Sequence, residues 1–326
     1  ALEFLRVQYE FLTCDSQVAF FTDMSRKWGG ASSFWLGTFR TYLFTDPALI
    51  EAVVMDKEGV FAKDAMTHEL EDLLGQGLLT AEGDHWRRQR KLAAPALKRK
   101  QIEAYADWMV ELTEREIEKW SDGDEVELHH AMMQLTLKIV VKTLFNMEMK
   151  GELTTIGQAI DDAMDVFYQY SHTLWRFVPD QIPTPLKRKF DRTIKQLDEV
   201  IYDLIRRRRE SGEEGDDLLW RFIVANHDDG TTMTNKQLRD VAITMFLAGH
   251  ETTALAVTYA WFLLSKNPRV VQKLFAELDE VLGDRRATAA DVHGLPYLKA
   301  VIQETLRLYS PAWIIGREAT EDTQVG

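Results

Sequence analysis

The longest apolar stretch of the chain, from Val241 to Leu264, carries a polar segment at its centre. Residues 248–253 read Ala-Gly-His-Glu-Thr-Thr, which places a glycine, a carboxylate and two hydroxyl groups where the composition predicts burial. An interior glycine weakens a helix by roughly 1 kcal/mol relative to alanine. An unpaired buried carboxylate costs far more, or it takes up a proton. We therefore expect function, rather than stability, to explain this segment.

The ends of the helix around this segment are marked in the sequence. Thr234 and Gln237 have the spacing of a capping box, and Asn267–Pro268 ends the helix because a residue before proline avoids helical dihedral angles. A helix of about 32 residues between these signals is roughly 48 Å long. That length also suits a membrane span. Glu251 near the centre and the polar first turns argue against a span, so none is expected.

One face of this helix is defined by residues that recur at about 100° per residue. These are Val241, Thr244, Met245, Ala248, Thr252 and Leu255. Glu251 lies on the flank of this face, and His250 points nearly the opposite way.

Composition limits the possible classes of function. With 326 residues, 45% of them hydrophobic, the chain can bury a large core in one or two domains. Its formal net charge of −13 does not favour binding to nucleic acid. The single cysteine, Cys14, excludes an internal disulfide framework and a cysteine-based zinc site. It fits a reducing compartment, and because the first residues read as an amphipathic helix rather than a signal peptide, we expect a cytoplasmic protein.

Helical periodicity dominates the chain, so the predicted fold class is mainly α with a small β region. Strand-like alternation is confined to Ser33–Thr45, which reads as a hairpin, and to a weaker pattern after Ile314. The predicted helices cover residues 2–28, 47–56, 84–94, 99–120, 128–146, 155–175, 185–211, 216–227, 234–266, 268–282 and 297–309.

Glu304 and Arg307 are three residues apart on a predicted helix, between apolar neighbours. This pattern predicts a buried, charged and hydrogen-bonded pair. The alternative is a surface pair on a helix, which contributes a few tenths of a kcal/mol. Glu-x-x-Arg by itself is a very weak signal, and it gains weight from Pro311 and Arg317 behind it.

Trp86 and Arg90 are four residues apart and share one helix face directly after the turn at Gly83. Their indole and guanidinium groups donate hydrogen bonds and accept none. Such a pair suits a carboxylate at the edge of an apolar ligand. A cation–π pair on a basic helix face explains the motif equally well.

In their order along the chain, these motifs resemble the cytochrome P-450 family, the haem-thiolate monooxygenases. The resemblance rests on Trp-x-x-x-Arg at 86–90, Ala-Gly-x-Glu-Thr-Thr at 248–253, Glu-x-x-Arg at 304–307, and Pro311 with Arg317. It covers essentially the whole chain and looks like the soluble bacterial type. It implies a single P-450-like domain over residues 1–326, from which the C-terminal part of the family fold is missing.

The resemblance implies haem b as the cofactor and assigns five residues to it. Trp86 and Arg90 would hold one haem propionate, and Arg317 the other. Ala248 and Gly249 would let the long helix pass close over the porphyrin.

The resemblance also implies roles for two polar pairs. Glu251 and Thr252 would be the catalytic acid–alcohol pair that delivers protons during the activation of dioxygen. The alternative for Thr252 is a hydrogen bond to a carbonyl of its own helix. Glu304 and Arg307 would be structural and orient the loop that carries the thiolate ligand.

The thiolate ligand itself is expected beyond Gly326, since Cys14 lies far upstream of every haem motif. Two interpretations follow. In the favoured one, the 326 residues are part of a longer protein. In the other, the chain is a haem-free, catalytically inactive homologue or fragment that acts as a binding or scaffold protein.

The predicted reaction inserts one oxygen atom from dioxygen into a hydrophobic small molecule such as a fatty acid or terpenoid. The residues expected to line the substrate pocket are Leu73, Leu78, Leu79, Phe167, Val241, Thr244, Met245 and Ala248, with Tyr168 and Tyr170 beside Phe167. Apolar residues at helical spacing are more often plain core. The sequence does not distinguish between hydrophobic substrates.

Electrons are expected from a ferredoxin or flavodoxin-type partner, or from a reductase fused after Gly326. A separate partner would dock on a basic surface near the haem edge, where its acidic groups would be steered by charge. The residues of this surface are Arg87, Arg88, Lys91, Lys98, Arg99 and Lys100. The alternative is a solvated helix face, as charge runs usually are.

Overall fold

The computed structural model describes residues 16–326 with a few internal gaps. The residues outside the description are 1–15, 37–38, 147–156, 158, 160–161, 168, 170–181, 183, 213, 216 and 226–231. Two compact units make up the chain. Unit 1 comprises residues 1–65 and 316–326, and unit 2 comprises residues 66–315.

The described part of unit 1 contains two helices, a two-stranded hairpin and a second pair of short strands. Its described elements are α2 (Gln17–Trp28), β1 (Ala31–Leu36), β2 (Phe39–Phe44), α3 (Pro47–Met55), β3 (Phe61–Ala62) and β4 (Glu318–Ala319). β1 and β2 pair antiparallel with Ala31 opposite Phe44, and β3 pairs antiparallel with β4. Phe20, Met24 and Phe34 form a small core between α2 and the hairpin. The predicted hairpin is confirmed, and the weak pattern after Ile314 forms β4.

Unit 2 is helical throughout the part that the structure describes. Its elements are α4 (Ala65–Glu69), α5 (Glu71–Leu74), α6 (Gly83–Ala93), the 3₁₀ helix η1 (Ala94–Leu97), α7 (Arg99–Ile117), α8 (Leu128–Phe145), α10 (Pro185–Glu210), α11 (Leu218–Val224), α12 (Asn235–Lys266), α13 (Pro268–Val281), the 3₁₀ helix η3 (Ala289–Gly294) and α14 (Pro296–Leu308). Residues 162–167, within the predicted helix 155–175, are also helical.

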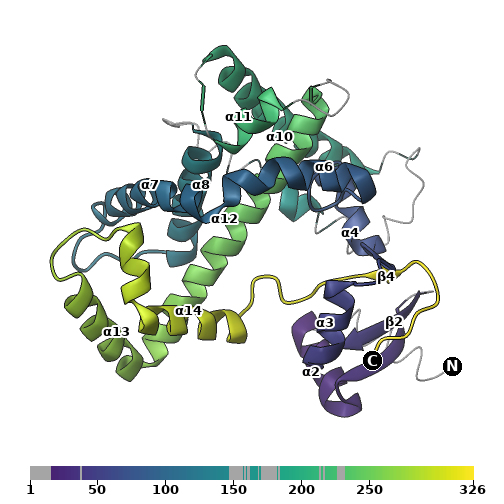
Figure 1. Cartoon of the computed structure of the whole chain (residues 1–326), viewed down its shortest axis with the longest axis horizontal. Coiled ribbons are helices and arrows are strands. Elements are labelled where there is room, and N and C mark those ends of the chain that lie inside the picture. The colour runs from purple at the N-terminus through teal and green to yellow at the C-terminus, as the bar shows by residue number, and fades with distance from the viewer. Residues whose placement is uncertain are drawn as a thin grey trace. The chain divides into compact units, whose positions relative to one another are not determined.

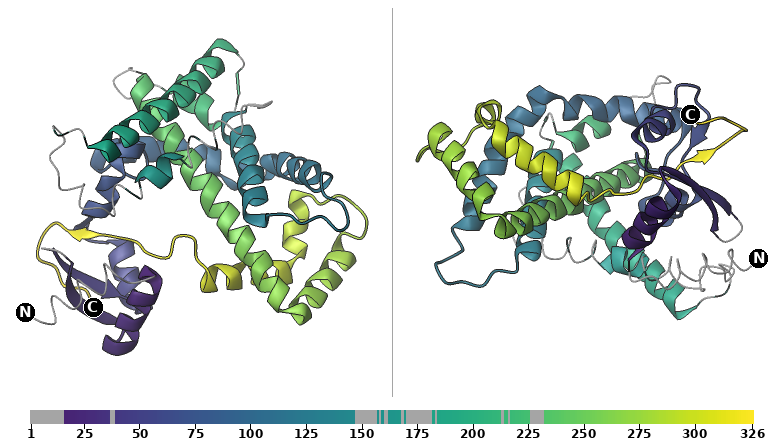
Figure 2. Two further views of the ribbon diagram at one scale, coloured as in Figure 1. Left: turned by 180° about the vertical axis from the view of Figure 1, so that it is seen from behind. Right: turned by 90° about the horizontal axis from the view of Figure 1, so that it is seen from below.

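The long helix α12 runs through unit 2 from one end to the other (Figure 1). Its capping box at Thr234 and Gln237 is present, and its 32 residues match the predicted length. It packs along α8, with α10 and α11 beside its N-terminal part and α13 and α14 beside its C-terminal part (Figure 2). The ring of Phe246 stacks on Phe145 of α8 at 4.3 Å. This helix pair is the centre of the largest hydrophobic core.

By length and composition, α12 is also the one helix of the described chain that could cross a membrane. In the structure, 39% of its most apolar window is buried. The central helix of a globular core meets the same criterion. Contacts with α5, α8, α10, α11, α13 and α14 account for the apolar residues on its buried side.

Candidate active site

The middle of α12 presents two faces of opposite character. His250 and Ala254 are buried on the side that packs against α8, whereas Ala248, Thr252 and Thr253 are exposed among the described residues. Ala248 and Thr252 therefore share a face and His250 points away from it, as the helical periodicity predicts. Except for the buried His250, the polar segment therefore lies on a side of α12 that is accessible among the described residues.

Thr252 makes a hydrogen bond within its own helix. Its hydroxyl donates to the carbonyl oxygen of Ala248 at 2.6 Å. Thr258 makes the same contact with Ala254 at 2.8 Å, so this geometry is ordinary for α12. A hydroxyl that donates one hydrogen bond still offers lone pairs as acceptors. Glu251, half-buried on the flank of the exposed face, lies next to it along the chain.

Gly249 faces α8. A Cβ atom built on it would lie 2.9 Å from Cγ2 of Val140, which is closer than real Cβ contacts allow. Its missing side chain therefore lets α12 and α8 pack closely. Among the two small residues expected against a porphyrin, Ala248 is the one whose side chain lies on the exposed face.

His250 is a core residue on the α8 side of α12. Burial lowers its pKa to about 4, with a further lowering by nearby His129 and an opposing hydrogen bond to the backbone of Met133. The Thr136 hydroxyl donates to the carbonyl of His250 at 3.0 Å. Its imidazole is therefore neutral at pH 7, and within the described residues its Nδ1 has no hydrogen-bond partner.

Trp86 and Arg90 lie on the exposed side of α6. Over the described residues, neither side chain has a hydrogen-bond or ion-pair partner in the protein, and no cation–π contact joins them. Arg87 on the same helix is paired with Asp84 at 2.8 Å. The structure thus places an indole and a guanidinium one turn apart with their donors unused, which fits a carboxylate ligand better than a cation–π pair.

Glu304 and Arg307 form the predicted ion pair on α14. Two hydrogen bonds, both 2.7 Å, join the guanidinium to the carboxylate, and they lower the pKa of Glu304. The prediction of burial is wrong for the described structure, where these side chains are 56% and 65% exposed. Apolar neighbours on the same helix, Ile302 and Leu306, are exposed as well. The flanking residues indicate a face that could be covered, but no described part of the chain covers it.

Arg317 lies in unit 1 directly before β4. Its side chain is exposed, and Nη1 donates to the carbonyl of Gly316 at 2.7 Å. A Cβ atom at Gly316 would overlap the carboxylate of Asp64, so the chain before Arg317 packs closely on the segment before α4.

Large exposed apolar side chains occur on the C-terminal half of α12, on α13, on α14 and in the segment that follows α14. They are Trp261, Phe262, Phe275, Ile302, Leu306, Leu308, Trp313, Ile314 and Ile315, and they are called the apolar face below. Tyr309 stacks on Tyr259 at 5.0 Å, which joins α12 to the end of α14. Exposed patches of this kind mark surfaces that contact a ligand or other protein.

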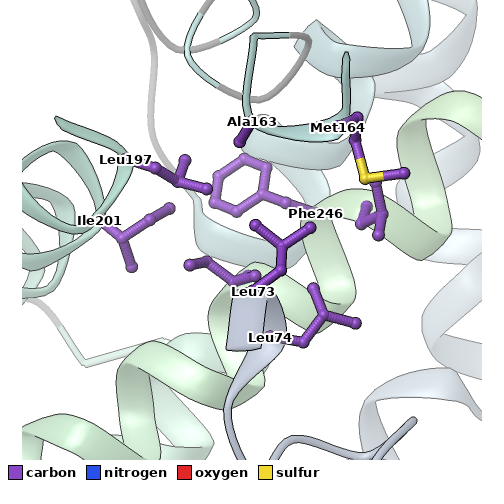
Figure 3. Close-up of a pocket in the computed structure, with 9 residues that line it drawn as sticks. Leu73, Leu74, Ala163, Met164, Leu197, Ile201 and Phe246 are labelled. Carbon is purple, nitrogen blue, oxygen red and sulfur yellow. The ribbon is translucent and has the colours of Figure 1, made fainter. Parts of the chain in front are cut away.

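An apolar cavity lies beside the N-terminal half of α12, next to α5 and α10 (Figure 3). Leu73, Leu197 and Phe246 line it with six other residues. The volume of this cavity is about 10 Å³, which is room for about one water molecule. It is a packing void in the core.

Of the residues predicted to line a substrate pocket, only Leu73 borders this cavity. Val241 and Thr244 are buried, Ala248 and Leu79 are exposed, and the others are half-buried. The half-buried residues are Leu78, Phe167 and Met245. Tyr168 and Tyr170 lie outside the described residues. The predicted pocket residues other than Leu73 therefore do not line this cavity.

Comparison with known proteins gives one family. A family model for cytochrome P-450 matches residues 5–326. The chain belongs to the cytochrome P-450 family. The predicted family and the predicted fold class, mainly helical with a small β region, are both confirmed.

Relatives and a solved structure agree with this P-450 assignment. Cyclooctatin synthase of Streptomyces melanosporofaciens is 32% identical over 89% of this chain and 64% of its own length. Pentalenene oxygenase of Streptomyces avermitilis is 29% identical over the same shares. The crystal structure of the cytochrome P450DA heme domain matches with a TM-score of 0.81 and 26% identity, over 93% of this chain and 68% of that one. The chain thus spans less than two thirds of these curated relatives.

The residues present fit the haem group that the P-450 family implies. Trp86 and Arg90 offer two unused donors for a propionate, and Ala248 leaves the exposed face of α12 free of bulk. The apolar face provides hydrophobic surface of the kind that a porphyrin or further protein covers. The only cysteine, Cys14, lies outside the described residues.

Proposed function

We propose that the protein is a haem-dependent monooxygenase that inserts one oxygen atom from dioxygen into a hydrophobic small molecule. Its family supports this, as do relatives named cyclooctat-9-en-7-ol 5-monooxygenase and pentalenene oxygenase. The observation that carries the proposal is the exposed pair Trp86 and Arg90, whose donors have no partner in the described protein.

Haem b, when bound, supplies the iron at which dioxygen is activated. Trp86 Nε1 and the Arg90 guanidinium would hold one propionate by charge-assisted hydrogen bonds, and Arg317 the other. The methyl group of Ala248 leaves room beside α12. Gly249 faces α8 in the structure, so in this proposal only its backbone would lie near the porphyrin.

Glu251 and Thr252 are the proposed proton-handling pair. The Thr252 hydroxyl donates a hydrogen bond to the Ala248 carbonyl at 2.6 Å. Its oxygen would accept a hydrogen bond from a water molecule or another donor. Glu251, on the flank of the same face, would take protons from water and pass them on. Glu304 and Arg307 have a structural role in the proposal, as an ion pair that orients the loop carrying the thiolate ligand.

The proposed substrate is a fatty acid, terpenoid or similar hydrophobe. The names of the two relatives, which refer to cyclooctat-9-en-7-ol and pentalenene, support a carbon skeleton with few polar groups. The proposed lining combines the exposed Leu79 and Ala248 with the half-buried Leu78, Phe167 and Met245.

The proposed electron donor is an acidic ferredoxin or flavodoxin-type protein. Within the proposed basic surface, Arg87 and Arg99 are already paired with Asp84 and Glu103 at 2.8 Å. The remaining cations are not ion-paired among the described residues and would carry the docking: Arg88, Lys91, Lys98 and Lys100. A cytoplasmic location is part of the same proposal.

Spectroscopy of the protein expressed from its whole coding sequence tests this function. Reduction under carbon monoxide should give the thiolate-type shift of the haem absorption. Arg90→Leu should lower the haem content, whereas Arg269→Leu, at an exposed arginine of α13 without a described partner, should not. Purified wild-type protein without haem, or without that shift, would contradict the proposal.

A further inference from the structure

The two helices that carry the proposed haem residues are linked through a three-residue turn, Gly75–Gly77. We infer that Asp240 is a positioning residue: through this turn it fixes the Trp86–Arg90 pair of α6 relative to the exposed face of α12. The inference rests on the proposed function, because only bound haem gives this spacing its importance.

Asp240 lies in the second turn of α12, and its carboxylate is 2% exposed. Oδ2 accepts a hydrogen bond from the backbone N–H of Gln76 at 3.0 Å. Lys236 donates to the same oxygen at 2.9 Å, and Arg239 donates to Oδ1 at 3.1 Å. Arg239 is itself held by Asp198 of α10 at 2.6 Å. The carboxylate is therefore held in place by α12 and α10, with one hydrogen bond directed at the turn.

Two glycines allow the turn to lie directly on α12. Gly75 has φ +61, and a Cβ atom there would overlap the Asp240 carboxylate. A Cβ atom at Gly77 would overlap the Thr244 hydroxyl and lie 2.6 Å from the carbonyl oxygen of Asp240. Gly77 has no left-handed φ, so contact with α12 is the reason that it has no side chain. Any larger residue would push the turn away from the helix.

Gln76 connects the turn to the helix with the haem residues. Its carbonyl oxygen accepts from Nε2 of Gln89 on α6 at 2.7 Å. Nε2 of His85, on the same helix, lies 2.8 Å from Nε2 of Gln89 and 3.2 Å from the Gln76 carbonyl oxygen. Gln89 is 2% exposed and lies between Trp86 and Arg90 on the same helix.

Gln76 also bonds to a third helix, since its side chain donates to Glu71 of α5 at 2.6 Å. Thr80 closes the turn by donating to the Gly75 carbonyl at 2.5 Å. One residue thus joins α5, α6 and α12. A catalytic arrangement must be held to within a fraction of an ångström, and buried hydrogen bonds behind the contacting residues are the usual means.

Gly77→Ala and Asp240→Ala test the inference from the α12 side. Both should raise the rate of haem loss to an acceptor protein and the rate of amide hydrogen exchange in residues 83–93. The expected increase is about tenfold, because both substitutions disturb the hydrogen bond from the Gln76 N–H to the buried Asp240 carboxylate. Loss of one hydrogen bond to a buried charge has about that effect. Asp240→Asn keeps an acceptor for the Gln76 N–H and should recover part of the wild-type rates. Gly294→Ala is the matched control, because the nearest atom to its Cβ would be Val281 Cγ1 at an ordinary 3.4 Å.

Gln89→Met tests the same link from the α6 side without touching α12. It removes the Gln89 Nε2 donor to the Gln76 carbonyl and leaves the 3.2 Å contact of that carbonyl with His85 Nε2. The Gln89 oxygen has no described partner to lose. Haem loss should rise as in Gly77→Ala, while the melting temperature stays close to that of Gly294→Ala. Wild-type exchange and haem loss in all three link variants would overturn the inference. Hydrogen exchange needs no haem, so it still decides on the link if wild-type protein binds none and the proposed function fails.

Discussion

At the scale of single residues, the exposed face of α12 combines small and polar side chains. The Thr252 hydroxyl donates its hydrogen bond to the Ala248 carbonyl, as the Thr258 hydroxyl does to the Ala254 carbonyl. Its position, and not its hydrogen bond, separates it from an ordinary helical threonine: it is exposed where Thr258 is half-buried.

Thr252→Ala should shift electrons from product to hydrogen peroxide. The variant lacks the hydroxyl that we propose handles the proton, while substrate affinity should stay within about twofold, since apolar contacts are retained. Product and peroxide formed per electron are the quantities to measure. Thr258→Ala removes an equivalent helix hydrogen bond and should couple like wild type. If both variants form the same amount of product per electron, Thr252 has no role in proton delivery beyond its hydrogen bond within the helix.

His250 predicts a pH dependence of folding. Burial lowers its folded-state pKa from 6.5 to about 4, so the unfolded chain binds the proton more readily. Its contribution to stability is complete above pH 6.5 and is lost as the pH falls toward 4. The full loss is roughly 3 kcal/mol.

Urea unfolding of wild type and His250→Leu between pH 4 and 7 measures this contribution. The difference in unfolding free energy between the two proteins should decrease as the pH falls through that range. His129, whose charge lowers the pKa of His250, is present in both proteins. A difference that does not change with pH would mean that His250 titrates normally in the folded state.

At the scale of elements, the ends of helices were the most predictable feature. The capping box at Thr234 and the break at Asn267 are local signals, and α12 begins and ends within one residue of the prediction. β3 was missed because a two-residue strand, Phe61–Ala62, shows no alternation.

Burial and long-range contacts were less predictable. The apolar neighbours of Glu304 predict a covered helix, but what covers a helix depends on segments distant in sequence. The link between Gln76 and Asp240 joins residues 164 positions apart. Its only sequence signals are Gly75 and Gly77 on either side of Gln76, and Asp240 at the start of an apolar stretch. Neither signal indicates which residue the other contacts.

The basic residues that end α6 and begin α7 predict a salt-dependent electron transfer. Replacing both Arg88 and Lys98 by Glu should slow reduction by an acidic donor at low ionic strength and flatten its salt dependence. Stopped-flow reduction at increasing salt measures this. Arg269→Glu with Lys273→Glu on α13 changes the net charge equally and should affect the rate less. Identical behaviour of the two double variants would place the docking surface elsewhere.

At the scale of the whole molecule, the long helix α12 of unit 2 buries apolar side chains in one half and exposes them in the other. The core of unit 2 is centred on the N-terminal part of α12, where Leu238, Val241 and Phe246 are buried. The C-terminal half of the same helix instead exposes Trp261 and Phe262. One helix therefore serves both as the centre of a core and as part of the apolar face.

The apolar face predicts that a polypeptide of these 326 residues associates with itself in water. Monomeric proteins rarely expose contiguous apolar patches beyond a few hundred Å². Trp261→Lys combined with Ile302→Lys should therefore lower the sedimentation coefficient and the binding of a hydrophobic dye. Val224→Lys on α11 exchanges an equally accessible apolar residue outside this face and should change neither. If the double variant and the control sediment alike, the apolar face does not drive association.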